Sequence, residues 1–358
     1  MMPAFGGPVP VGFPADRSQP VKGPRSMRIR QGLRRAFPLC CQLICLGIMG
    51  TLHAEENRLL RAVDIRLFCQ ARPDLGSAKL ERIRPGERIW VVRQAQVGPT
   101  TWYAEGGSPN GSPRCWVYGP GTVELDQARP GPGWLALLDH ILAREDMAFE
   151  EYVEVDNALQ EAGDWLTQDR KAIDDSGLIQ FRRLQMIERM LAKDDAGRDA
   201  VNGSPLKKAW ILGHSELIEY SEPGGRWWLR KAPYRALLER YKSEPFAEEI
   251  AWALTTAEPG DECDSNCMLE QIANGPLWYL LRYPAGAHAP AAMQQAMDAA
   301  RQAADMACSG ELPPEYRDRL KDGTIQKIRD ALARITLPGT QEISRSLDGA
   351  VRKCRMPR

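Results

Sequence analysis

The chain has 358 residues, with 47 basic and 47 acidic side chains and 43% hydrophobic residues. This length corresponds to about two domains. The composition is that of a globular protein, which excludes wholesale disorder, collagen, a coiled coil and a multi-span membrane protein. The balanced charge also argues against a nucleic-acid binder, because contact with phosphates requires a surplus of Lys and Arg.

The charge is distributed unevenly along the chain. The first 54 residues carry seven basic side chains and one acidic side chain, so the other 304 residues have 40 basic and 46 acidic ones and a net charge of −6 by difference. A basic stretch at 28–35 precedes an apolar, almost uncharged run at 36–52. This order is typical of a secretory signal peptide, which we place at 27–54.

The export signal leads to two expectations about location. Cleavage after Ala54 would make the protein periplasmic or secreted in a bacterium, whereas an uncleaved signal would anchor it in the membrane. Residues 1–26 are rich in Pro and Gly and lack apolar periodicity. We interpret them as a disordered leader or as sequence upstream of a true start at Met27.

Cysteine usage supports the same compartment. The chain has nine cysteines, of which three lie in the signal segment. The other six are Cys69, Cys115, Cys263, Cys267, Cys308 and Cys354. An even number in an exported chain predicts disulfide bonds. Pairing by sequence proximity gives Cys69–Cys115 and two bridges among the last four, in one of three arrangements, and the alternative is a set of free buried thiols.

Between residues 57 and 125, short apolar runs alternate with turn residues. Ile89–Val92 is a β-rich run, and the loop at 106–113 contains three glycines and two prolines. We predict four or five short strands in this region. So many strands in so few residues favour a small barrel over a sandwich.

Four segments of this region carry a family resemblance. In order along the chain, Leu67–Pro73, Arg84–Gly86, Trp102–Tyr103 and Cys115–Tyr118 resemble motifs of the bacterial SH3-like domain. That family has a Leu-Asn-Val-Arg-Ser-Gly-Pro stretch, a Lys-Gly turn, a Trp-Tyr strand and a Gly-Trp-Val strand. The chain departs from the pattern at Phe68, Gln70, Arg72 and Cys115. The resemblance therefore implies the barrel fold more than a binding groove, in a module often attached to exported envelope proteins that sometimes binds peptidoglycan.

Aromatic side chains are the binding candidates. Trp102, Tyr103 and Tyr118 could form a stacking surface for sugar or peptide, and the alternative is that they fill the barrel core. Trp228 is also a candidate. It follows Trp227, and adjacent residues on a strand point to opposite faces, so one of the two tryptophans should be exposed or covered by another element.

The rest of the chain is expected to be helical. Residues 126–133 contain two prolines and two glycines and are predicted to be a linker. Residues 134–358 then show helical periodicity, with a β-hairpin or sharp bend at 217–230. We expect helices at about 135–142, 178–191, 233–241, 246–255, 268–283, 290–308, 314–335 and 342–353. The fold class is therefore α+β, a small all-β barrel followed by a mainly helical domain.

One junction within the helical region has a family resemblance of its own. Leu277–Pro284, followed by an alanine-rich helix from Pro290, resembles the helix-turn-helix junction of tetratricopeptide-like hairpins. The resemblance implies stacked helical hairpins that act as a scaffold for protein contact.

The sequence contains few candidate catalytic motifs. The Cys263–Cys267 turn is similar to the nucleophile turn of cell-wall cysteine endopeptidases, Asp-Cys-Ser-Gly, but Glu262 replaces the Asp and Asp264 separates the cysteine from Ser265. We therefore favour a disulfide role for it and assign no catalytic residue, metal or cofactor.

An acidic cluster is the other candidate for chemistry. Glu150, Glu151, Glu154 and Asp156 could hold a metal or cleave glycosides. We interpret the run as the solvated face of a helix.

The sequence as a whole predicts an exported, non-enzymatic cell-envelope binding or scaffold protein. Its SH3-like module would contact peptidoglycan or an envelope protein, with no nucleic-acid partner and membrane contact only through an uncleaved signal. The alternative is a cell-wall hydrolase with a helical catalytic domain.

Overall fold

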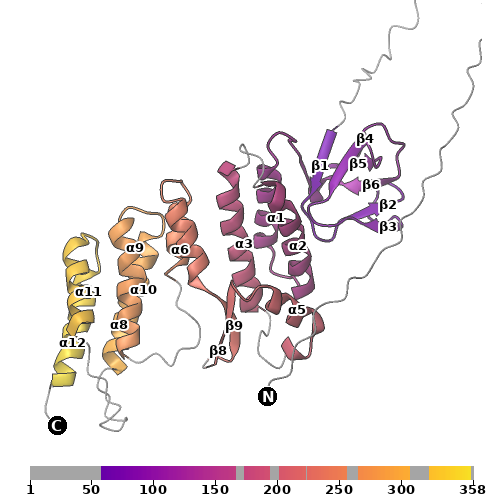
Figure 1. Cartoon of the computed structure of the whole chain (residues 1–358). Helices are drawn as coiled ribbons and strands as arrows, with labels where there is room; N and C mark the ends of the chain where they lie inside the picture. Colours follow the sequence, from indigo (N-terminus) through magenta and orange to yellow (C-terminus); the bar gives the residue numbers. More distant parts are fainter. Residues whose placement is uncertain are drawn as a thin grey trace, which may run out of the picture. The chain divides into compact units, whose positions relative to one another are not determined.

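The structure is a computed structural model in which residues 58–166, 173–193, 201–222, 224–255, 265–306 and 322–355 are described. Strands occupy the beginning of this range and helices most of the remainder, as Figure 1 shows. The predicted α+β class is therefore confirmed. The described residues all belong to one compact unit.

The larger sheet is antiparallel throughout. Its strands are β1 (Arg58–Ala62), β2 (Phe68–Gln70), β3 (Lys79–Arg82), β4 (Arg88–Val97), β5 (Thr100–Glu105), β6 (Cys115–Tyr118) and β7 (Thr122–Glu124), with the short 3-10 helix η1 (Gly119–Gly121) before β7. The strand order is β3-β2-β6-β5-β4-β1-β7. Because β3 and β7 are the two outer strands of this order, hydrogen bonding does not close the sheet.

A disulfide staples this sheet. Cys69 in β2 and Cys115 at the start of β6 form a bond, with their Cα atoms 5.4 Å apart, which confirms the predicted pairing. Both side chains are buried beside Leu60, Ile89 and Val117 in one apolar cluster. The bond thus joins two adjacent strands and links the two ends of the segment that contains β3, β4 and β5.

Most of the helices match the expected ranges. Among the described residues they are α1 (Gly131–Ala143), α2 (Phe149–Leu166), α3 (Ile173–Lys193), α5 (Pro205–Gly213), α6 (Lys231–Arg240), α7 (Ala247–Ala253), α8 (Ser265–Asn274), α9 (Pro276–Arg282), α10 (Ala289–Met306), α11 (Asp322–Arg334) and α12 (Thr340–Arg355). Helices α2 and α5 have no counterpart among the expected ranges. Within the described ranges, none of the helices has both the length and the apolar character required to cross a bilayer.

Two helix bounds correct the expectations. The single helix expected at 268–283 is two helices, because the chain turns at Gly275, where a Cβ would lie 2.8 Å from the Gln271 carbonyl oxygen. Helix α1 begins at Gly131, inside the segment expected to be a linker. Pro132 is compatible with this start, since the first turn of a helix has no internal partner for its N–H groups.

A two-stranded sheet interrupts the helices within 217–230. Strands β8 (Ile218–Ser221) and β9 (Arg226–Leu229) pair antiparallel, where the sequence indicates a hairpin or sharp bend. β9 packs on α3, and Ile218 and Leu229 are buried in the helical core.

A buried arginine connects the larger sheet to the first helix. The Arg61 side chain of β1 is 1% exposed, donates from Nη1 to the Gly86 carbonyl oxygen at 2.8 Å, and lies 3.9 Å from the centre of the Trp134 ring in α1. Burial, together with the nearby charge of Arg88, lowers the pKa of Arg61 to about 10. Gly86 has a φ of 78°, and a Cβ there would lie 2.6 Å from the Trp134 ring. The sheet and α1 therefore pack with no space for a side chain at Gly86.

The disulfide is expected to contribute about 4 kcal/mol to the free energy of unfolding, since its two ends are 46 residues apart. Urea unfolding of C69A, C115A and the double variant measures this contribution. Removing either cysteine breaks the same bond, so each single variant should lose nearly as much stability as the double variant. Additive losses in the two single variants would contradict a stabilising crosslink.

Candidate functional site

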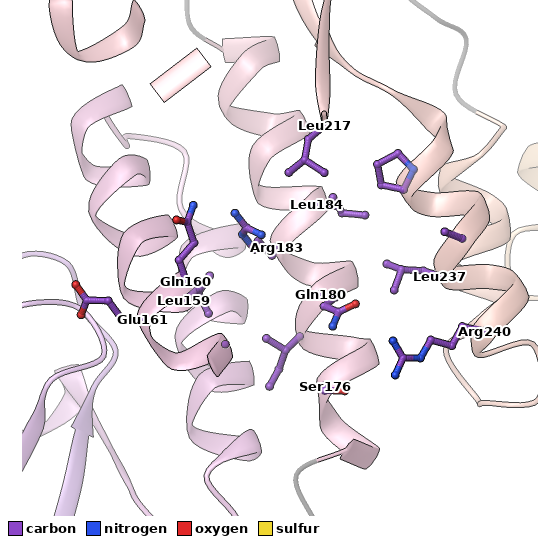
Figure 2. A pocket seen from close by; sticks show the side chains of 14 residues that line it. Leu159, Gln160, Glu161, Ser176, Gln180, Arg183, Leu184, Leu217, Leu237 and Arg240 are labelled. Atoms are coloured by element: carbon purple, nitrogen blue, oxygen red, sulfur yellow. The ribbon is translucent and has the colours of Figure 1, made fainter. Parts of the chain in front are cut away.

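A cleft lies between α2, α3 and α6. Its volume is about 900 Å³, within the range of small-ligand sites. The lining residues are Leu159, Gln160, Glu161, Gly163, Ser176, Ile179, Gln180, Arg183, Leu184, Leu217, Pro233, Ala236, Leu237 and Arg240. Figure 2 shows Gln160 and Arg183 turned toward each other, and Arg240 extending from α6 toward Gln180. The cleft thus combines an apolar lining with a few polar groups.

Helix α2 places a carboxylate on its buried face. Tyr152, Val155 and Leu159 are buried at helical spacing, and Asp156 falls within the same stripe, only 1% exposed. The interpretation of the acidic run as a solvated face is therefore wrong for Asp156. The other members of the run are different, since Glu151 and Glu154 form ion pairs with arginines of the sheet region.

Asp156 is held by four side chains, from α3, from α5 and its C-terminal cap, and from α2 itself. Its Oδ1 accepts from Arg183 Nε at 2.6 Å, and its Oδ2 lies 2.9 Å from His214 Nε2. Oδ2 also accepts from Trp210 Nε1 at 3.2 Å and from Gln160 Nε2 at 3.0 Å. Because a buried carboxylate is costly unless it is paired and hydrogen-bonded, these contacts keep α2, α3 and α5 in register.

His214 is held as firmly as its partner. Its Nδ1 lies 2.7 Å from the Trp210 carbonyl oxygen, and its ring stacks on the Trp210 indole with centroids 4.1 Å apart. A carbonyl oxygen can only accept, so Nδ1 carries a proton, and the contact of Nε2 with Asp156 favours a second proton. Gln160 Nε2 and Arg183 Nη2 also lie 2.9 Å and 3.3 Å from His214 Nε2. The contacts with Asp156 and with the Trp210 carbonyl outweigh them and favour an imidazolium paired with the carboxylate.

The pKa values follow from this arrangement. Burial alone would raise the pKa of Asp156, but hydrogen bonds from His214 and Arg183 and the charge of Arg183 lower it to about 2. Burial alone would lower the pKa of His214, but its hydrogen bonds to Asp156 and to the Trp210 carbonyl outweigh this and raise it above 6.5. Since Asp156 already accepts from Arg183, Gln160 and Trp210 as well as contacting His214, and the other His214 nitrogen contacts the Trp210 carbonyl, the arrangement favours holding charge over transferring a proton.

Arg183 and Gln160 connect this network to the cleft, because both also line it. Across the cleft, Arg240 on α6 is exposed and forms no ion pair with any carboxylate of the described residues. Glu161 is the one carboxylate of the lining. Two guanidinium groups, amides and an apolar floor suit a ligand that carries a carboxylate and an apolar part.

The aromatic binding candidates do not form one surface. Trp102 is 2% exposed and contacts Tyr118 edge-on, with ring centroids 5.4 Å apart. Trp102 pairs with Tyr118 and Tyr103 with Val117 across β5 and β6, so the two tyrosines lie on opposite faces. Trp228 is half-buried in the separate β8–β9 sheet, opposite Glu219. None of the four lines the cleft.

Among the described residues, the remaining cysteines provide no free thiol that could act as a nucleophile. Cys263, Cys308 and the side chain of Cys354 lie outside the described residues. Cys267 in α8 is disulfide-bonded, to a cysteine whose side chain is outside that range.

One group of metal-ligating side chains occurs in the described part of the chain. It consists of Cys69, Glu105 and Cys115. Since the two cysteines are bonded to each other, neither supplies a thiolate to a metal.

Sequence reasoning missed the cleft residues Gln160, Arg183 and Arg240 and the buried His214. One signal was present, because Asp156 follows Tyr152 by four residues and precedes Leu159 by three, which places it on the apolar face of a helix. A charged side chain at such a position requires a partner. The sequence does not identify this partner, because the packing of distant helices decides which cation lies beside Asp156.

Comparisons with protein-family models, with curated protein sequences and with solved structures give no match for this chain.

Replacement of Asp156 by Asn should destabilise the protein by about 3 kcal/mol, because it leaves Arg183 and His214 without their anion in a buried site. The matched control is E154Q, two residues away on α2, which removes only the solvent-exposed ion pair with Arg82 and should cost about 1 kcal/mol or less. Urea unfolding at neutral pH measures both. Equal losses would contradict the assignment of Asp156 as a buried anchor.

The stability contributed by His214 should depend on pH. Its pKa is raised on folding, so its contribution is complete below pH 6.5 and is lost as the pH rises through the folded-state pKa. The difference in unfolding free energy between the wild type and H214Q should therefore be larger at pH 5.5 than at pH 9. The Asp156 contribution is not lost in this interval, since it declines only as the pH falls below 3.8 toward 2. A difference that grows with pH would overturn the imidazolium assignment.

Proposed function

We propose that this protein is an exported cell-envelope binding protein whose cleft between α2, α3 and α6 holds a carboxylate-bearing peptide of peptidoglycan. The observation that carries the proposal is the pair Arg183 and Arg240 above an apolar lining. Peptidoglycan stem peptides combine carboxylates with alanine methyl groups, so both parts of the cleft have a counterpart in the ligand. The basic and apolar segments that precede the fold support the export part of the proposal.

Preorganisation supports binding at this site. The Arg183 guanidinium is fixed by Asp156 Oδ1, and Gln160 by Oδ2, so both polar groups are oriented before a ligand arrives. A fixed guanidinium loses little side-chain entropy on binding a carboxylate. The saturated Asp156–His214 pair favours a binder over a hydrolase, because neither group is available as a general base.

We also propose that the sheet of residues 58–125 is a barrel of the bacterial SH3-like kind. What supports this is that three of the four segments carrying the resemblance contribute to one antiparallel sheet, Leu67–Pro73 through β2, Trp102–Tyr103 in β5 and Cys115–Tyr118 in β6. The fourth, Arg84–Gly86, lies in the turn between β3 and β4. In this proposal the module positions the protein in the envelope, next to the wall it binds.

The test is binding of the purified protein to peptidoglycan sacculi by co-sedimentation, and to soluble muropeptides by calorimetry. R240Q should weaken binding about tenfold, equivalent to about 1.4 kcal/mol, because it removes a charge-assisted hydrogen bond to the ligand. The matched control is R235Q, an exposed arginine on the same helix that does not line the cleft. Muropeptides with amidated carboxyl groups should bind weakly to the wild type.

The proposal fails if wild-type protein neither pellets with sacculi nor binds muropeptides. It also fails if R235Q weakens binding as much as R240Q, since the attraction would then be general charge and not the cleft. Release of soluble fragments from sacculi by the wild type would instead favour the hydrolase.

A further inference from the structure

A second groove lies on the other side of α6, between α6, α9 and α11. Its volume is about 900 Å³. It is lined by Arg235, Leu238, Glu239, Leu254, Ala273, Asn274, Trp278, Leu281, Arg282, Gly323, Gln326, Lys327, Asp330, Ala331 and Arg334. It has no lining residue in common with the first cleft.

The floor of this groove is apolar. Leu238 and Ala331 are buried, and Trp278 and Leu281 are half-buried at its surface. Trp278 combines a large flat apolar ring with an N–H donor, and such residues dominate the energetics of protein interfaces. An occupant must therefore offer an apolar side chain to this floor.

The rim of the groove is cationic. Arg235, Arg282, Lys327 and Arg334 are all exposed, and none of them forms an ion pair with a carboxylate of the described residues. Arg282 lies over the Trp278 ring at 5.9 Å, and Lys327 donates to the Asn274 side chain. Other exposed cations of the helical surface include paired ones, as in Arg301–Glu342 and Arg329–Asp348, and Arg240, which has no carboxylate partner among the described residues.

The two carboxylates of the groove do not neutralise this rim. Glu239 accepts from Lys242, which is outside the groove, and Asp330 accepts from the Gln326 amide. Four cations thus face two carboxylates that already have other partners. The excess positive charge stands out in a chain whose residues beyond the signal segment sum to −6.

We propose that this groove binds an acidic amphipathic peptide segment of a partner protein, with an apolar side chain on Trp278 and carboxylates on the cationic rim. The apolar floor distinguishes this occupant from a phosphate polymer, which has no side chain to bury there. The net negative charge of the rest of the protein also repels a long polyanion. The protein would then hold the wall at one side of α6 and a protein partner at the other.

The experiment measures fluorescence anisotropy of a short labelled peptide composed of Asp, Glu, Leu and Phe, titrated with the full-length protein. The groove variant is R235E/R282E/R334E. The matched control is R72E/R129E/R226E, which reverses the same number of exposed charges on residues outside the groove. Thermal unfolding of both variants verifies that they fold.

The groove variant should weaken peptide binding at least about tenfold at low salt, while the control retains wild-type affinity. W278A should weaken binding of the peptide, and a peptide with Ser in place of Leu and Phe should bind poorly to the wild type. Equal losses in the groove and control variants would overturn the proposal. So would phosphatidylglycerol vesicles or an oligonucleotide binding as tightly as the peptide with the same sensitivity to the groove variant.

This test is separate from the one for the cleft. R240Q should bind the acidic peptide normally, and the groove variant should pellet normally with sacculi. Loss of peptide binding in R240Q would place the peptide in the cleft and overturn the groove as its site.

Discussion

The buried carboxylate of Asp156 is the constraint on which the helical region depends. A charge that is 1% exposed must be neutralised, and here the neutralising groups come from α3 and from the end of α5, far along the chain. Satisfying one side chain therefore fixes the relative positions of three helices. A paired buried charge adds a directional requirement that the hydrophobic packing of leucine and methionine side chains does not impose.

Helix α6 forms one wall of both the cleft and the groove. α6 presents Leu237 and Arg240 to one side and Leu238 and Arg235 to the other, so a single amphipathic segment forms a wall of two sites. The two sites differ in how their arginines are held. Arg183 in the cleft is fixed by Asp156, whereas the arginines of the groove are held by no carboxylate of the described residues. Arg240, on the other wall of the cleft, is likewise without a carboxylate partner among the described residues, so Arg183 is the one arginine of the two sites that is held in place by a carboxylate.

The sequence was sufficient for the change from strands to helices, for most of the helices and for the Cys69–Cys115 bond, because these depend on local periodicity and turn residues. It was insufficient for the number of strands, four or five expected against seven in the sheet, and for α5. It was insufficient at Gly275, where a glycine and a proline break a run whose apolar spacing is continuous. It was also insufficient for the site. Asp156, His214 and Arg183 are separated by up to 58 residues, from 156 to 214, and only tertiary packing brings them together. The sequence also did not show which faces Tyr103 and Tyr118 occupy, because strand register decides this.

The contact between Arg61 and Trp134 bears on how such a protein could be assembled from parts. A guanidinium in β1 is covered by an indole from α1, and glycines at 86 and 133 allow the two surfaces to approach. Excision of the sheet at the end of β7 would uncover the arginine and leave the indole of α1 in water. The sheet therefore depends on its contact with α1 and is not an independent module. If recombination moved the sheet into another protein, the first turn of α1, which carries Trp134, would have to move with it. The segment that can be exchanged as a unit therefore extends beyond the end of β7.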